Sequence, residues 1–177
     1  MVINLRRFLG HRHIFFSIVG LFAISAVYVQ VADLIDHGPN AIAAARTEHK
    51  VVALTFDHSW GNKFTPSILD SLSKHDAKVT FFIMGPWAKK FPEVAQRMVA
   101  DGHEIASHGF RHENYGDMTV EWVKEDIQKA HAQIKEVTGV DPVFIRPPNG
   151  HYSQKSLQAT HELGYKTRNE AMKQLSV

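Results

Sequence analysis

The chain has 177 residues, of which 44% are hydrophobic and 21% are charged. That length supports one domain with its own core, and the composition excludes wholesale disorder. Cysteine is absent, so disulfides, thiol catalysis and zinc ribbons are excluded. The net charge is +2, but Arg6, Arg7 and Arg12 contribute +3 within the first 13 residues. The rest of the chain is close to neutral, which argues against a nucleic-acid-binding protein.

An uncharged, apolar stretch runs from Ile14 to Ala32 and is followed by Asp33. A helix of that length spans the roughly 30 Å hydrocarbon core of a bilayer. The arginines before it place the amino terminus in the cytoplasm and the body of the chain outside. We therefore predict that residues 1–33 form a basic segment and a single-pass signal anchor in the cell membrane, with an extracytoplasmic body. A cleaved signal peptide and a buried soluble helix are the alternatives.

Residues 34–49 show no clear strand pattern and are expected to form a linker or a short docking segment. The body, residues 50–177, alternates short apolar runs with amphipathic segments. Buried strands are expected over residues 51–56, 79–84, 104–107 and 143–145. Helices are expected over residues 64–75, 87–100, 119–137 and 153–163, with a break at Pro92 in the second and Thr119 as N-cap of the third.

Regular alternation of strands and helices predicts an α/β fold with parallel strands covered by helices. In such folds the sites form where strands end, at the carboxyl edge of the sheet. Polar residues cluster directly after three of the expected strands: Asp57 and His58, His108 and His112, and Arg146 and Asn149. Taken singly, each cluster could equally be a polar or proline-stiffened turn.

His108 and His112 are four residues apart, a spacing that on a helical turn places both rings on one face, where they could share a metal. Gly109 follows the first histidine, which excludes the metalloprotease pattern with glutamate at that position. The chain contains 12 histidines, so a chance pair is the competing interpretation.

Three segments carry a resemblance in their order and spacing: Thr-Phe-Asp-His-Ser-Trp-Gly at 55–61, Ser-His-Gly-Phe-Arg-His at 107–112, and Arg-Pro-Pro-Asn-Gly at 146–150. Together they resemble the motifs of the polysaccharide deacetylase family, the NodB-homology domain of carbohydrate esterase family 4. The phrases at 79–82 and 101–105 are similar to the same family. The resemblance covers residues 50–166, and the first segment looks most like the sporulation-associated branch.

The resemblance implies a distorted (β/α) barrel and a single divalent metal, often zinc. It also implies removal of acetyl groups from N-acetylglucosamine or N-acetylmuramic acid units of a polymer. By the same likeness Asp57 is the general base, His108 and His112 are metal ligands, and Arg146 orients the base. The backbone N–H of Asn149 would complete an oxyanion site, for which the side chain is immaterial.

The first departure from the family is His58, which stands where the family has a second aspartate that binds the metal. Histidine is itself a good zinc ligand, and three-histidine zinc sites exist. We therefore hypothesise a site made of His58, His108 and His112. The alternative is that His58 points elsewhere.

The second departure is at the carboxyl end. A βα unit takes about 30 residues, so residues 51–177 hold about four units and the beginning of a fifth strand. The family continues with a motif containing Asp and Trp, and then with a Leu-x-His motif whose histidine is the general acid. We expect a partial barrel from a truncated product, of marginal stability because of its open sheet edge; a naturally short form is the alternative. A catalytically inactive carbohydrate-binding or structural relative, or a non-functional fragment, are the alternatives for function.

Overall fold

The computed structural model describes residues 39–42 and 52–168. The chain divides into two compact units, residues 1–37 and 38–177, and the described residues all belong to the second. The predicted membrane anchor and residues 169–177 lie outside the described residues. In the described ranges, no helix has the length and apolar character needed to cross a membrane.

Five strands form one parallel sheet in the order β1-β2-β3-β4-β5. They are β1 (Thr55–His58), β2 (Thr80–Ile83), β3 (Glu104–Ser107), β4 (Phe144–Ile145) and β5 (Lys166–Thr167). Each strand lies in the sheet beside the strand that precedes it in the chain, which is the strand order of a (β/α) barrel. The predicted α/β fold with a parallel sheet is thereby confirmed.

Five helices connect the strands: α2 (Thr65–Lys74), α3 (Gly85–Lys90), α4 (Pro92–Ala100), α5 (Val120–Thr138) and α6 (Gln154–Glu162). Two short 3₁₀ turns are η1 (Tyr115–Asp117) and η2 (Pro148–Gly150). The expected break at Pro92 is confirmed, because α4 begins there. Thr119 is the N-cap of α5, and its side chain accepts a hydrogen bond from the backbone N–H of Trp122.

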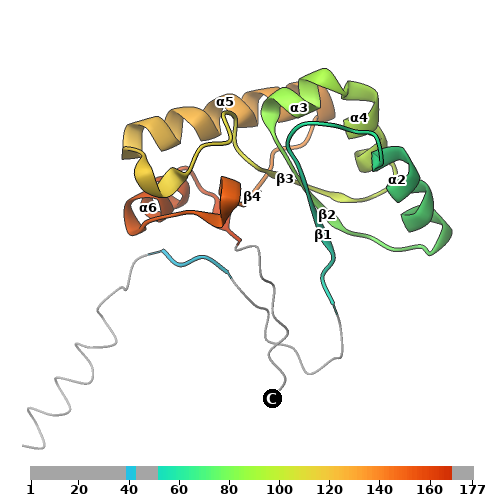
Figure 1. Cartoon of the computed structure of the whole chain (residues 1–177), viewed down its shortest axis with the longest axis horizontal. Helices are drawn as coiled ribbons and strands as arrows, with labels where there is room; N and C mark the ends of the chain where they lie inside the picture. The colour runs from blue at the N-terminus through green and yellow to red at the C-terminus, as the bar shows by residue number, and fades with distance from the viewer. Residues whose placement is uncertain (1–38, 43–51, 169–177) are drawn as a thin grey trace, which may run out of the picture. The chain divides into compact units, whose positions relative to one another are not determined.

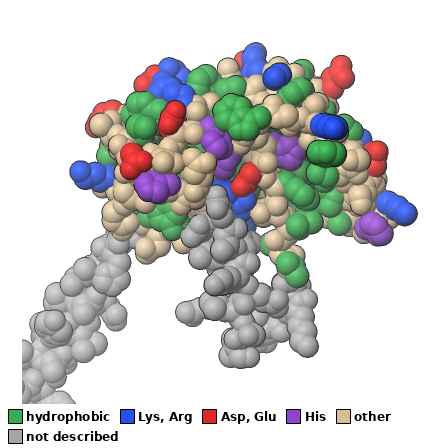
Figure 2. Space-filling model, viewed as in Figure 1, with side chains coloured by type: hydrophobic (Ala, Val, Ile, Leu, Met, Phe, Trp, Pro, Cys, Tyr) green, Lys and Arg blue, Asp and Glu red, His purple; other side chains and the backbone are tan. Residues whose placement is uncertain are grey.

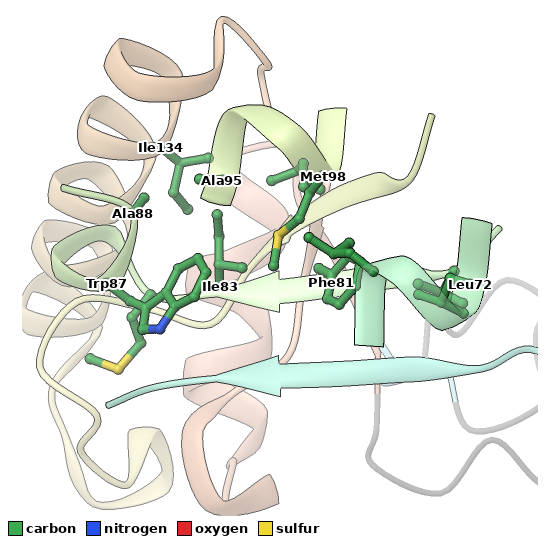
Figure 3. Close-up of a cluster of buried hydrophobic side chains, with 12 residues drawn as sticks. Leu72, Phe81, Ile83, Trp87, Ala88, Ala95, Met98 and Ile134 are labelled. Atoms are coloured by element: carbon green, nitrogen blue, oxygen red, sulfur yellow. The ribbon is translucent and has the colours of Figure 1, made fainter. Parts of the chain in front are cut away.

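Helices α2, α3, α4 and α5 lie along one side of the sheet (Figure 1). The main hydrophobic core fills the space between them and β2. Figure 3 shows Phe81 and Ile83 of β2 packed with Trp87, Met98 and Ile134 from three of these helices. All five side chains are at most 1% exposed. Each such burial stabilises the fold by about 1.5–3 kcal/mol, so this cluster holds the sheet and its helices as one body.

The start of the first strand differs from the prediction, whereas the expected beginning of a fifth strand is confirmed. The first strand begins at Thr55 rather than Val51, and Val52 and Leu54 are 87% and 51% exposed. At the other edge a short fifth strand is present. Ile42, from the expected linker, pairs in parallel with Arg168, and its N–H donates to the Thr167 carbonyl at 2.8 Å. Part of the predicted linker therefore extends the sheet beyond β5.

Candidate active site

Asp57 and Arg146 form an ion pair at the carboxyl edge of the sheet. Nη1 of Arg146 donates to Oδ1 of Asp57 at 2.7 Å, and Nη2 donates to the Thr55 hydroxyl at 3.1 Å. Thr55 and Asp57 point to the same side of β1 because side chains alternate along a strand. The guanidinium also lies 4.0 Å from the ring centre of Phe82 and is 3% exposed. The predicted pairing of these two residues is confirmed by this geometry.

His58 faces the opposite side of β1, toward the helices. Its Nε2 lies 3.0 Å from the Thr65 hydroxyl, and its ring packs against Phe81 and Trp87 of the main core. Burial lowers the pKa of His58 to about 4, against the opposing charge of Asp57. The structure does not bring His58 together with His108 and His112, so the hypothesis of a three-histidine site is wrong for this arrangement. The physical reason is the two-residue period of the strand.

His108 follows β3 and is 2% exposed. Its Nδ1 lies 2.9 Å from the Arg146 carbonyl oxygen, which can only accept, so Nδ1 carries the proton. Nε2 then keeps its lone pair, the arrangement typical of a metal-binding histidine. Burial lowers the pKa of His108, with Asp57 acting in the opposite direction, so the ring is neutral at pH 7.

His112 lies beside His108, with their ring centroids 5.3 Å apart. The two rings meet through a loop and not through the expected helical turn. Gly109 and His112 both have positive φ, +78° and +58°, and this reverses the backbone so that the second ring returns to the first. The predicted proximity of the pair is confirmed, whereas the predicted local conformation is wrong.

The loop that carries the two histidines is held by Asp126 of α5. Its carboxylate accepts from the backbone N–H groups of Phe110 and Arg111 at 2.7 and 3.0 Å, and from the Tyr115 hydroxyl at 2.8 Å. Asp126 is fully buried. A Cβ on Gly109 would lie 2.5 Å from the Tyr115 oxygen and 3.0 Å from Asp126 Oδ2, so only glycine fits there. Sequence reasoning missed Asp126, although a charged residue on the apolar stripe of a helix is a readable signal.

Asn149 lies in η2 with φ +57° and ψ +12°, a left-handed conformation that asparagine tolerates. Its side-chain amide donates to Asn114 Oδ1 at 2.8 Å. The side chain is therefore tied to the loop before η1, and the predicted role of the backbone N–H stays a prediction.

The donors present fit a divalent metal only in part. The imidazole side chains of His108 and His112 are of a kind that zinc accepts as ligands. Catalytic zinc sites commonly have three protein ligands. Among residues 39–42 and 52–168, no group of three His, Cys, Asp or Glu side chains could hold a metal. The fit is thus limited to two histidines, and the carboxylate of Asp57 is committed to Arg146.

A hollow of about 500 Å³ opens beside Asp57, between the end of β1 and the start of α2. Trp60 and Phe64 line it, and they are 70% and 67% exposed. The Trp60 ring lies 5.4 Å from that of His112, centroid to centroid. Figure 2 shows histidine and acidic side chains near the middle of one face of the molecule, with hydrophobic side chains around them.

A profile of known sequences decides the family. The polysaccharide deacetylase profile matches residues 44–168, which include each of the site residues described above. The chain belongs to the polysaccharide deacetylase family. This family comprises hydrolases that act on N-acetyl amide bonds of polysaccharides, and the resemblance of the three motifs is confirmed.

Two curated relatives illustrate the similarity. The peptidoglycan-N-acetylmuramic acid deacetylase PdaA of Bacillus subtilis is 34% identical over 129 residues, 72% of this chain and 49% of the relative. A peptidoglycan-N-acetylglucosamine deacetylase of Bacillus cereus is 37% identical over 114 residues, 64% of this chain and 42% of the relative. The chain therefore spans about half the length of the curated relatives it matches.

Solved structures show the same fold. The Bacillus subtilis PdaA structure, a family 4 carbohydrate esterase, superposes with a TM-score of 0.69 at 31% identity, covering 80% of this chain and 61% of that one. A pseudoenzyme of the same esterase family from Bacillus anthracis superposes with a TM-score of 0.71 at 28% identity, covering 76% and 48%. Similarity thus extends to a member described as a pseudoenzyme.

Proposed function

We propose that this protein hydrolyses N-acetyl groups on a cell-wall or spore-wall polysaccharide, peptidoglycan or a chitin-like polymer, with a divalent metal, zinc by preference. The observation that carries this proposal is the convergence of two pairs at one sheet edge. The Asp57–Arg146 ion pair and the His108–His112 pair are joined by the hydrogen bond from His108 to the Arg146 carbonyl. The named activities of the relatives support the same reaction.

An amide carbonyl is a poor electrophile, so its hydrolysis needs an activated water and a stabilised oxyanion. A divalent ion held by His108 and His112 would polarise the acetyl carbonyl and acidify water. Asp57 accepts the proton of the attacking water as general base. Arg146 keeps the Asp57 carboxylate oriented through its Nη1–H. The backbone N–H of Asn149 stabilises the oxyanion by donating to it.

Acetate release tests this proposal. The full-length chain, loaded with zinc, is incubated with N-acetylated peptidoglycan and with N-acetylglucosamine tetramer, and acetate is measured. Asp57→Asn should lower the rate by about 10² or more, because it removes the general base. The matched control is Asp70→Asn, which removes a surface partner of Arg97 away from the site. Release that is absent in the parent, or equal in parent and Asp57→Asn, would contradict the proposal.

A second candidate is a catalytically inactive relative that binds glycan without hydrolysing it. The specific observation in its favour is His58, which occupies the position of a metal ligand in the family and instead packs in the core. The similarity to a pseudoenzyme supports it as well. Binding of N-acetylglucosamine tetramer without acetate release, with zinc present in excess, would favour this candidate.

Location is proposed from the sequence alone. The basic residues before the apolar stretch support a single-pass protein of the cell membrane with its body outside. A role in sporulation is proposed from the likeness of residues 55–61 to that branch. Protease treatment of intact cells should remove the body and leave the amino-terminal segment protected.

A further inference from the structure

Trp60 is an exposed aromatic side chain on a fixed backbone next to the candidate active site. Its side chain is 70% exposed, whereas the backbone that follows it is anchored at Gly61 and Asn62. Nε1 of Trp87, a core residue that is 1% exposed, donates to the Gly61 carbonyl at 3.0 Å. The Thr65 N–H donates to the Asn62 carbonyl at 3.1 Å, where α2 begins.

The exposed ring of Trp60 lies beside a polar side chain of the candidate site, His112. An aromatic ring in water contributes little to folding, and exposed apolar surface next to a polar site is typical of ligand-binding surfaces. Because the loop is already held by a partly buried hydrogen bond from Trp87, a ligand that stacks on Trp60 loses little loop entropy on binding. The position is thus preorganised for a flat ligand.

The place of Trp60 selects the ligand. Its ring lies 5.4 Å from His112, and it lines the same hollow of about 500 Å³ as Asp57. Phe64, 67% exposed, lines that hollow further along, with the Lys63 ammonium 5.3 Å from its ring centre. A glycan that presents an acetamide between Asp57 and His112 would therefore have a neighbouring unit within reach of the Trp60 ring, and a pyranose offers apolar C–H faces to stack on it.

We propose that Trp60, with Phe64 beside it, forms a sugar-stacking subsite that binds a pyranose unit of an N-acetylated glycan next to the unit that is deacetylated. This inference rests on the proposed function, because it takes the glycan of that reaction as its ligand. The aromatic face supplies contact area, and the flanking Lys63 and Ser59 line the rim where sugar hydroxyls would lie.

The test measures binding separately from hydrolysis. Full-length protein is titrated with N-acetylglucosamine tetramer by isothermal calorimetry in the presence of a chelator, so that turnover does not interfere. Trp60→Ala should weaken Kd about tenfold or more, as truncation of a buried aromatic anchor does. Trp60→Phe should stay within about threefold of the parent, because it keeps a ring at the same place.

Leu54→Ala is the matched control. Leu54 is also exposed, at 51%, but it lies just before the amino end of β1, whereas the candidate site lies at the carboxyl end. The Kd of Leu54→Ala should therefore equal that of the parent. An unchanged Kd in Trp60→Ala, or a parent that does not bind the tetramer, would overturn the subsite. Binding that depends on Trp60, together with no acetate release in the zinc-loaded assay, would support the subsite and overturn the proposed hydrolysis. Acetate release together with a Kd that does not depend on Trp60 would support the proposed hydrolysis and overturn the subsite.

Discussion

The ion pair between Asp57 and Arg146 contributes to stability because the arginine is buried. Arg146 is 3% exposed and Asp57 is 32% exposed, so the guanidinium has little access to water and needs the carboxylate as its counter-charge. The backbone carbonyl of the same arginine accepts a hydrogen bond from His108 Nδ1, so the pair and the histidine lie next to each other. A change at Asp57 should therefore affect stability as well as chemistry.

Asp57→Asn should lower the free energy of unfolding by about 2–3 kcal/mol, because it leaves a buried charge without its partner. The control Asp70→Asn breaks the Arg97 ion pair, whose partners are 38% and 69% exposed, and should cost much less. Urea unfolding of the two variants measures the difference. Equal losses would show that burial of Arg146 contributes nothing to the pair.

His58 gives the protein a stability that depends on pH. Its folded pKa of about 4 lies below the ordinary value of 6.5, so the unfolded chain binds the proton more tightly. The stability is fully present above pH 6.5 and is lost as pH falls toward 4, by about 3 kcal/mol in all. His58→Gln should flatten the unfolding free energy between pH 7 and 4 by that amount. The same slope in the parent and in His58→Gln would contradict this role of His58.

At the scale of elements, helix α5 shapes the histidine loop. Asp126 accepts hydrogen bonds from two loop N–H groups and from the Tyr115 hydroxyl, so the loop conformation is fixed by a helix that begins eleven residues after Gly109. The adjacent Glu125 makes only surface ion pairs, to Arg111 and Lys129. Two neighbouring acidic residues on one helix thus contribute differently: Asp126 holds the histidine loop, and Glu125 makes surface ion pairs.

Asp126→Asn should destabilise the fold by about 3 kcal/mol, because an amide nitrogen would replace one acceptor that faces a buried donor. Glu125→Gln should cost much less, because its ion pairs lie in solvent. Thermal unfolding compares the two, and the zinc affinity of the folded variants reports whether the loop still presents the histidines. A mild effect of Asp126→Asn on both stability and zinc affinity would contradict the assigned role.

Elements with strong periodic or terminal signals were predictable from sequence. The third strand, the N-cap Thr119 and the break at Pro92 appear where expected. The start of β1 and the side that His58 faces were not, because a one-residue shift along a strand exchanges its two faces. The contact of Ile42 with β5 could not be predicted either, because one backbone hydrogen bond between distant segments leaves no local sequence pattern.

For the whole molecule, the sheet presents β1 at one edge of the described structure and Ile42 beside β5 at the other. Exposed edges and the exposed Val52 and Leu54 favour association over solubility. The marginal stability expected from the sequence stays a prediction. A reversible melt of the full-length chain well above 60 °C would contradict it.

The central claim is that His108 and His112 hold the metal that the proposed reaction needs. Its most direct test is the thermal melt of the full-length chain with and without zinc, for the parent, His108→Ala and the control His161→Ala, an exposed position on α6. Zinc at about 100 times its Kd stabilises a folded site by about 2.7 kcal/mol, a rise of roughly 5–10 °C. We expect that rise in the parent and the control but not in His108→Ala. No rise in the parent, or the same rise in all three, would contradict the claim.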